Sequence, residues 1–139
     1  DLVNSARFSF AGQGSGTLTG ELLAVDRSDV PAFDLGFSKQ ALISVHDFAT
    51  TAGFDSVDLT IRYDDSLVGE FEEDLQIFHS TGGAWTPLSV TLDTTNKWIT
   101  ASGVDSLSLF AVGYAVPEPA SVILLALAAL PALRRQRQR

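Results

Sequence analysis

Apolar and polar residues alternate through several short stretches of the first 115 residues. The clearest stretch is 57–63, where polar residues separate Val57, Leu59, Ile61 and Tyr63. A period of two is typical of a β-strand with one face buried and one face in water, whereas an amphipathic helix repeats every 3.6 residues. The same alternation predicts strands over 6–10, 41–45 and 88–92.

Turn residues lie between the predicted strands. Thr81-Gly82-Gly83 separates two apolar stretches and predicts a β-hairpin, and the polar residues from Asp93 to Lys97 predict a second turn. The stretch 107–114 is apolar at almost every position, which indicates a central strand covered on both faces. Short strands separated by polar turns predict an antiparallel β-sandwich of the jelly-roll or immunoglobulin-like kind over residues 1–115.

The core of this sandwich should hold the large aromatic side chains. Buried aromatic residues contribute most to the packing of a small domain, so packing is the expected role of each of them. The stretch 12–16 is expected to be a flexible connection, and the stretch 26–36 has no clear period. The aromatic residues assigned to the core are Tyr63, Phe78, Trp85, Trp98 and Phe110.

Composition and charge narrow the range of functions. The chain has 139 residues, of which 45% are hydrophobic and 19% charged, so it is long enough for one domain and too apolar for a disordered chain. It has no cysteine, which excludes disulfides and thiolate metal sites. It also has no methionine and starts at Asp1, so we expect a mature form or a fragment. Residues 1–116 hold five basic and sixteen acidic residues. A surface this acidic repels phosphate, so nucleic acid is not an expected partner.

The residues that carry chemistry form no catalytic pattern. The acidic residues of 64–74 could supply oxygen ligands for calcium, but they lack EF-hand spacing, and solvated loop acids are the simpler interpretation. A pair of them could also serve glycoside hydrolysis, although acids on one loop do not indicate the required separation. His46 and His79 have no partner at zinc-ligand spacing, and no nucleophile elbow or phosphate loop occurs. We therefore expect no enzyme activity, no metal site and no cofactor. The acidic residues considered are Asp64, Asp65, Glu70, Glu72, Glu73 and Asp74.

The C-terminal residues differ in composition from the rest of the chain. Residues 120–133 are apolar and uncharged, and as a helix they would span about 21 Å, against roughly 30 Å for the hydrocarbon core of a bilayer. The four arginines of the tail 134–139 follow at once, and arginine stems can reach the membrane interface. A helix buried in the sandwich would place these four charges against an apolar core. We therefore predict a single transmembrane segment over 120–133 with a cytoplasmic tail, whose arginines are Arg134, Arg135, Arg137 and Arg139.

The tetrapeptide 116–119 reads Val-Pro-Glu-Pro and links the two parts. Each proline favours extended geometry in the residue before it, so this linker should be stiff and exposed, and therefore accessible to a processing enzyme. The motif, the apolar run and the arginine tail, in this order, resemble a PEP-CTERM protein-sorting signal, whose motif corresponds to Pro117, Glu118 and Pro119. The resemblance implies a protein exported by a Gram-negative bacterium, often one that makes exopolysaccharide, and processed by exosortase, an integral membrane enzyme.

The residues before the motif are similar to small β-sandwich modules of exported and autotransporter-like bacterial proteins. This resemblance implies no catalytic residues. The expected function is that of an envelope or matrix protein with a structural or adhesive domain, anchored in the inner membrane and then found at the cell surface or outside the cell. The alternatives are a carbohydrate-binding module of an exopolysaccharide-associated protein, with Trp85 or Trp98 as an exposed stacking platform, and a hydrolase fragment. The stretches that carry the resemblance are 59–65, 73–78, 83–85, 92–94 and 110–113.

Overall fold

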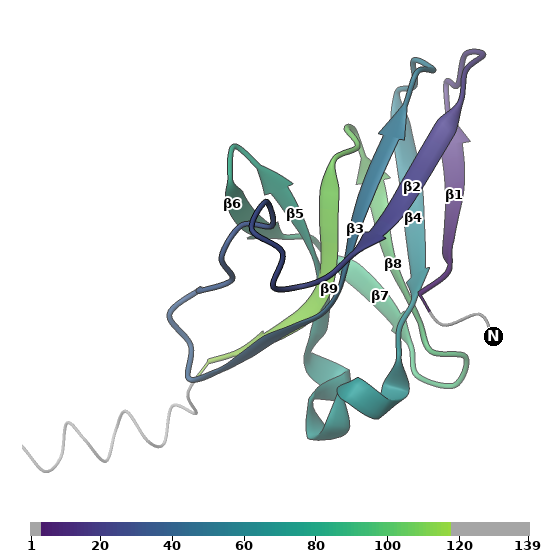
Figure 1. The fold of residues 1–139 in the computed structure, drawn as a ribbon. Helices are drawn as coiled ribbons and strands as arrows, with labels where there is room; N and C mark the ends of the chain where they lie inside the picture. The colour runs from purple at the N-terminus through teal and green to yellow at the C-terminus, as the bar shows by residue number, and fades with distance from the viewer. Residues whose placement is uncertain (1–3, 118–139) are drawn as a thin grey trace, which may run out of the picture.

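The computed structural model describes residues 4–117 and shows a mainly β protein with two antiparallel sheets (Figure 1). The predicted C-terminal helix lies outside the described residues. Two short 3-10 helices, η1 (Asp65–Leu67) and η2 (Gly69–Asp74), interrupt the strands. The strands are β1 (Ala6–Ala11), β2 (Leu18–Leu23), β3 (Lys39–Thr50), β4 (Ser56–Arg62), β5 (Leu75–Thr81), β6 (Ala84–Pro87), β7 (Val90–Asp93), β8 (Trp98–Val104) and β9 (Leu109–Val116).

Neighbouring strands in each sheet run antiparallel. The four-stranded sheet has the order β1-β4-β8-β7, and the five-stranded sheet has the order β2-β3-β9-β5-β6. The predicted strands are therefore confirmed, and the predicted stretch 88–92 corresponds to β7, which begins at Val90.

The main core lies between the two sheets, as in a β-sandwich. The alternation of 57–63 directs Val57, Leu59 and Ile61 of β4 into this core, where each has at most 1% of its surface exposed. Phe110 and Val112 of β9 meet them from the other sheet. Because side chains alternate between the faces of a strand, the polar partners of these residues point away from the core.

A second apolar cluster covers the outer face of the five-stranded sheet. It contains Phe78 and Trp85, which are fully or almost fully buried, and Val30 of the segment between β2 and β3 packs over them. The Trp85 side chain donates a hydrogen bond from Nε1 to the carbonyl oxygen of Pro31, at 2.9 Å. The stretch 26–36 without a period is thus part of the segment that covers this face, and β9 is buried on both faces as predicted.

Trp98 does not belong to the core, and its assignment there is wrong. It lies half-buried at the start of β8, and the next residue, Ile99, points into the space between the sheets. The guanidinium carbon of Arg7 lies 4.2 Å from the centre of the Trp98 ring, a cation–π contact on the outer face of the four-stranded sheet. In the alternation along β8, it is therefore Ile99 that faces the core, whereas Trp98, one position earlier, faces outward.

Both predicted turns are present. Gly82 and Gly83 link β5 to β6 with φ angles of 66° and 83°, the left-handed geometry that a two-residue hairpin turn requires. The turn between β7 and β8 is held by Asp93, which accepts hydrogen bonds from the backbone N–H of Thr95 and Asn96. These turns fix the register of the two hairpins.

The placement of β4 predicts unequal effects of two neighbouring substitutions. Ile61→Asp buries an unpaired carboxylate in the main core and should lower the free energy of unfolding by about 4 kcal/mol. Thr60→Asp, on the outer face, loses only the hydroxyl contact with Thr100, at 2.8 Å, and should cost about 1 kcal/mol. Urea unfolding followed by tryptophan fluorescence measures both values. Equal losses would contradict this register.

Candidate functional site

The end of β9 is where the chain leaves the sandwich. The pairing of β5 with β9 begins at the pair Leu75–Tyr114, so Ala115 and Val116 pair only with Gln40 and Lys39 of β3. The five-stranded sheet therefore narrows to a ribbon of two strands, which extends away from the other strands in Figure 1. We call residues 39–41 and 114–116 the exit ribbon. Pro117 follows it directly and is exposed.

Aromatic packing fixes the base of the exit ribbon. Phe71 of η2 stacks on Tyr114 of β9, with ring centroids 4.4 Å apart, and the Lys39 ammonium lies 5.8 Å from the centre of the Phe71 ring. An open groove of about 690 Å³ borders the ribbon, and Glu73, Leu88 and Pro117 are among its lining residues. The residue that begins the predicted sorting motif thus lies beside a surface groove with acidic residues on one side.

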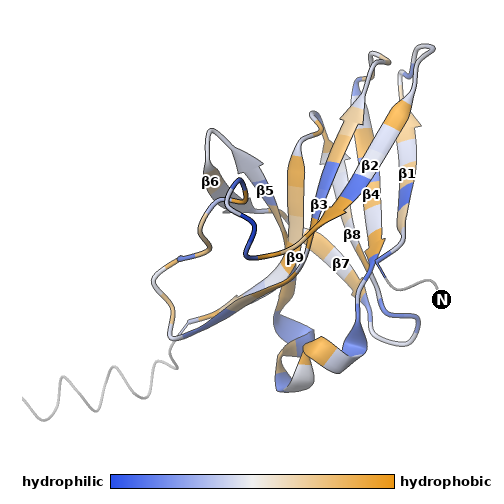
Figure 2. Ribbon diagram, viewed as in Figure 1, coloured by the Kyte–Doolittle hydropathy of each residue, from blue (hydrophilic) through white to orange (hydrophobic). Residues whose placement is uncertain are grey.

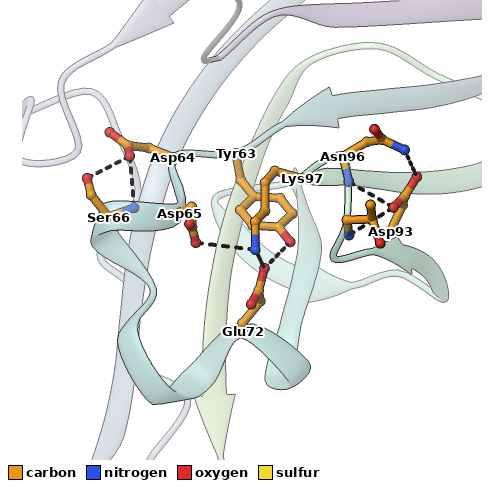
Figure 3. A network of polar contacts seen from close by, with 9 residues as sticks. Tyr63, Asp64, Asp65, Ser66, Glu72, Asp93, Asn96 and Lys97 are labelled. Carbon is orange, nitrogen blue, oxygen red and sulfur yellow. Dashed lines mark hydrogen bonds and ion pairs between the residues drawn. The ribbon is translucent and has the colours of Figure 1, made fainter.

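Some of the acidic residues of 64–74, which we call the acidic cluster, form part of a polar network that holds η2 near the turn between β7 and β8 (Figure 3). The Lys97 ammonium nitrogen lies 2.6 Å from Oε1 of Glu72 and 3.4 Å from Oδ1 of Asp65. Tyr63, whose ring is buried, donates its hydroxyl to the same Glu72 oxygen at 2.6 Å. Lys97 has a φ of 62°, a left-handed conformation at the last turn residue before β8. Sequence reasoning missed this network because Glu72 and Lys97 are far apart in the chain.

The protonation states in this network suit an ion pair and not acid–base catalysis. The hydrogen bond from Lys97, and then that from Tyr63, lowers the pKa of Glu72, while the hydrogen bond to Glu72 raises the pKa of Lys97. Burial, followed by the hydrogen bond to Glu72, raises the pKa of Tyr63. At neutral pH the carboxylate and ammonium are both charged and the phenol keeps its proton. Each group is thus held in its ordinary ionisation state.

The other acids of the cluster have separate local roles. Asp64 accepts hydrogen bonds from the backbone N–H and the hydroxyl of Ser66 and so caps η1. Glu70, Glu73 and Asp74 are exposed. Within residues 4–117, no three carboxylates or imidazoles come together as a set that could hold a metal ion.

The two histidines lie on opposite sides of the same aromatic residue in the main core. His46 of β3 and His79 of β5 are both direct cross-strand partners of Phe110, so β9 separates them. His46 shares a hydrogen bond of 3.0 Å with Ser44, and His79 one of 2.8 Å with Ser108. Burial lowers the pKa of His46 to about 4 and also lowers that of His79, so both rings are neutral at pH 7. Both histidines therefore have a structural role, with Nε2 of each ring bonded to a serine hydroxyl.

The structure describes only the first residue of the predicted sorting motif. Pro117 lies at the end of the exit ribbon, whereas Glu118, Pro119, the apolar run 120–133 and the arginines of 134–139 lie outside the described residues. Among the residues from 4 to 117, no helix has the length and apolar character needed to cross a membrane.

Comparison with known proteins adds no family. No family model matches the chain, and no curated protein or solved structure matches it. The candidate site is therefore defined by the sequence after β9 and by the geometry of the exit ribbon.

The buried imidazole of His46 predicts a loss of stability in mild acid. Between pH 7 and pH 5 the unfolded chain takes up a proton at this residue, with its ordinary pKa of 6.5, while the folded chain, with a pKa of about 4, does not. The free energy of unfolding should therefore fall by about 2 kcal/mol over this range through His46. Urea unfolding at the two pH values measures the change. In His46→Gln the fall should be clearly smaller, and an unchanged fall would contradict the assignment.

Proposed function

We propose that this chain is an exported envelope or extracellular-matrix protein whose C-terminal residues are a sorting signal read by an exosortase-type membrane enzyme. One observation carries the proposal, which is the order of Pro117-Glu118-Pro119, the apolar run 120–133 and the arginine-rich tail directly after a β-domain. The prolines keep the motif extended, and the arginines favour a cytoplasmic C-terminus. The unprocessed chain is anchored in the inner membrane, and the processed protein reaches the cell surface or the medium.

The geometry at the end of β9 supports processing without unfolding. Strand β9 completes its pairing with β5 at Tyr114 and with β3 at Val116, and Pro117 is already exposed. A cut after the exit ribbon therefore breaks none of the hydrogen bonds of the five-stranded sheet. The stacking of Phe71 on Tyr114 anchors the exit ribbon three residues before Pro117, the first residue of the motif.

The domain itself has a structural or adhesive role in this proposal. We place its sandwich in the jelly-roll or immunoglobulin-like group, whose members bind through loops and surfaces without a common catalytic site. The ionisable groups of the Tyr63–Glu72–Lys97 network bind one another, and both histidines bond to serines. In the described part of the chain these contacts leave each of these groups with a partner inside the protein.

The carbohydrate-binding alternative has less support. Trp85 is 6% exposed and its indole N–H is bonded to Pro31, so it offers no stacking face to a sugar ring, contrary to the expectation that it could be exposed. The Arg7 guanidinium covers one face of Trp98. A sugar ring would have to displace this cation before stacking there, so the structural or adhesive role is preferred.

Replacement of Pro117, Glu118 and Pro119 by alanine should block processing in a host that contains exosortase. The change lies after the last strand, so the domain should keep its circular-dichroism spectrum and unfolding midpoint. Mass spectrometry of the exported protein should show a wild-type chain that lacks the apolar run and the arginine tail. The variant should keep both and stay in the inner-membrane fraction.

A matched control replaces two exposed loop residues before β9, Asp105→Ala with Ser106→Ala, and should be processed like the wild type. Exported wild-type protein that still ends at Arg139, or a triple-alanine variant cut at the normal rate, would disprove the sorting signal.

The position of the arginines predicts the orientation of the anchored chain. The four arginines of 134–139 follow the apolar run, so residues 1–116 should lie outside the cytoplasm and the C-terminus inside. Alkaline phosphatase, which is active only in the periplasm, should be inactive when fused after Arg139 in a host without exosortase. A cytoplasmic reporter at the same site should be active. The reverse result would disprove this orientation.

A further inference from the structure

The two sheets end at different places on the side formed by β1 and β2. Strand β1 is the edge of the four-stranded sheet, and β2 is an edge of the five-stranded sheet. Phe8 of β1 packs edge to face against Phe48 of β3, with ring centroids 4.8 Å apart, so β1 lies opposite β3. Because β2 is the outer neighbour of β3, it projects beyond β1 by the width of one strand. This side of the sandwich therefore has a step.

The projecting strand exposes apolar side chains on its inner face. Directly paired residues of antiparallel strands share a face, and Gly20 pairs with the core residue Phe48. Leu18 and Leu22, two positions away on either side, therefore point to the same face as Gly20. They are 40% and 54% exposed, and Figure 2 shows the apolar colour at both ends of β2. Within residues 4–117, no strand of the facing sheet lies opposite them.

Both edges have few of the features that usually prevent pairing with another chain, since neither has a proline, a lysine or a bulge and each has one charged side chain. Natural edge strands are protected by proline, by lysine, by bulges or by charges that point inward. Strand β1 reads Ala-Arg-Phe-Ser-Phe-Ala and β2 reads Leu-Thr-Gly-Glu-Leu-Leu, and their single charges, Arg7 and Glu21, point outward. The opposite edge of the five-stranded sheet, β6, ends in Pro87. The exposed Leu18 and Leu22, together with unprotected edges, mark the β1–β2 side as an interaction surface.

We propose that this surface binds a second copy of the chain in a symmetric dimer. Strands β1 and β2 run in opposite directions (Figure 1). A two-fold axis parallel to the strands therefore brings β1 of each copy next to β2 of the other, antiparallel to it. Each projecting β2 fills the step of the other copy and extends its four-stranded sheet. The inner faces of the two β2 strands then cover each other, which buries Leu18 and Leu22, and the interface closes on itself as an isologous dimer.

Charge and side-chain size select one register for this pairing. With Arg7 opposite Glu21 of the second copy, Phe8 lies opposite Gly20, and Phe10 lies opposite Leu18. A shift by one residue would turn the apolar side chains outward, and a shift by two would place Arg7 opposite Thr19 or Leu23. Pairing of like edges, β1 with β1 and β2 with β2, would bring equal charges together and leave the steps unfilled. Glu21 lies 3.4 Å from Arg27 of its own chain, and its pairing with Arg7 of the second copy adds a second opposite charge, which favours the β1–β2 arrangement.

Disulfide trapping tests this arrangement directly, because the wild-type chain has no cysteine. Arg7→Cys and Glu21→Cys chains are prepared separately at full length in a mild detergent, at an ionic strength of about 0.15 M, which screens the repulsion between acidic chains. A mild oxidant should give a covalent dimer when the two variants are mixed and little when either is oxidised alone. No dimer in the mixture, or equal dimer from a single variant, would overturn the proposal.

A second measurement tests the buried leucine without cysteine chemistry. Leu22→Glu places a charge in the dimer interface, and because Leu22 is 54% exposed in one copy the fold should remain intact. The dissociation constant from sedimentation equilibrium should rise by roughly tenfold or more. Leu67→Glu is the matched control, since Leu67 is 56% exposed on η1, away from this surface, and should leave the constant unchanged. A monomeric wild-type chain, or equal effects of the two variants, would disprove the interface.

Discussion

The burial of β9 on both faces is the constraint on which the rest of the structure depends. Phe110 and Val112 point into the main core, and Ala111 between them points into the cluster on the outer face. The strand also pairs with β3 on one side and with β5 on the other. Gly113 lets β3 come close, because a Cβ atom there would lie only 2.5 Å from the carbonyl oxygen of Ala41. Both apolar clusters, and the base of the exit ribbon, thus depend on this strand.

This constraint connects the fold to the proposed processing. A strand held by two cores and two ladders is among the last parts of a protein to open, and local opening occurs where such contacts are few. At the end of β9 the pairing with β5 stops after Tyr114, and the pairing with β3 stops after Val116. The chain therefore changes from a central strand to an exposed proline within three residues. A signal placed there can be removed without loss of the domain.

Local patterns predicted the strands other than β2, because alternation, turn glycines and the apolar run of β9 act over a few residues. They failed where a distant segment decides the outcome. Trp98 and Ile99 are both large and apolar, and only the pairing of β8 with β4 determines which of them faces the core. The covering of Phe78 by Val30 and Phe33 depends on a segment without periodicity, whose place is set by the distant strands on which it packs. The ion pair of Glu72 and Lys97 likewise needs two turns to meet.

The five-stranded sheet has apolar side chains on both faces, and the four-stranded sheet covers only part of one of them. A five-stranded sheet opposite a four-stranded one has more apolar face than its partner can cover. On its outer face the segment between β2 and β3 supplies the cover within the chain, with Trp85 bonded to Pro31. On the inner face of β2 no described residue does so, and Leu18 and Leu22 remain in water. Figure 1 shows this edge on the side away from the exit ribbon. A second copy bound there would leave Pro117 accessible, so the proposed association of the domain and the proposed processing of the chain would not compete.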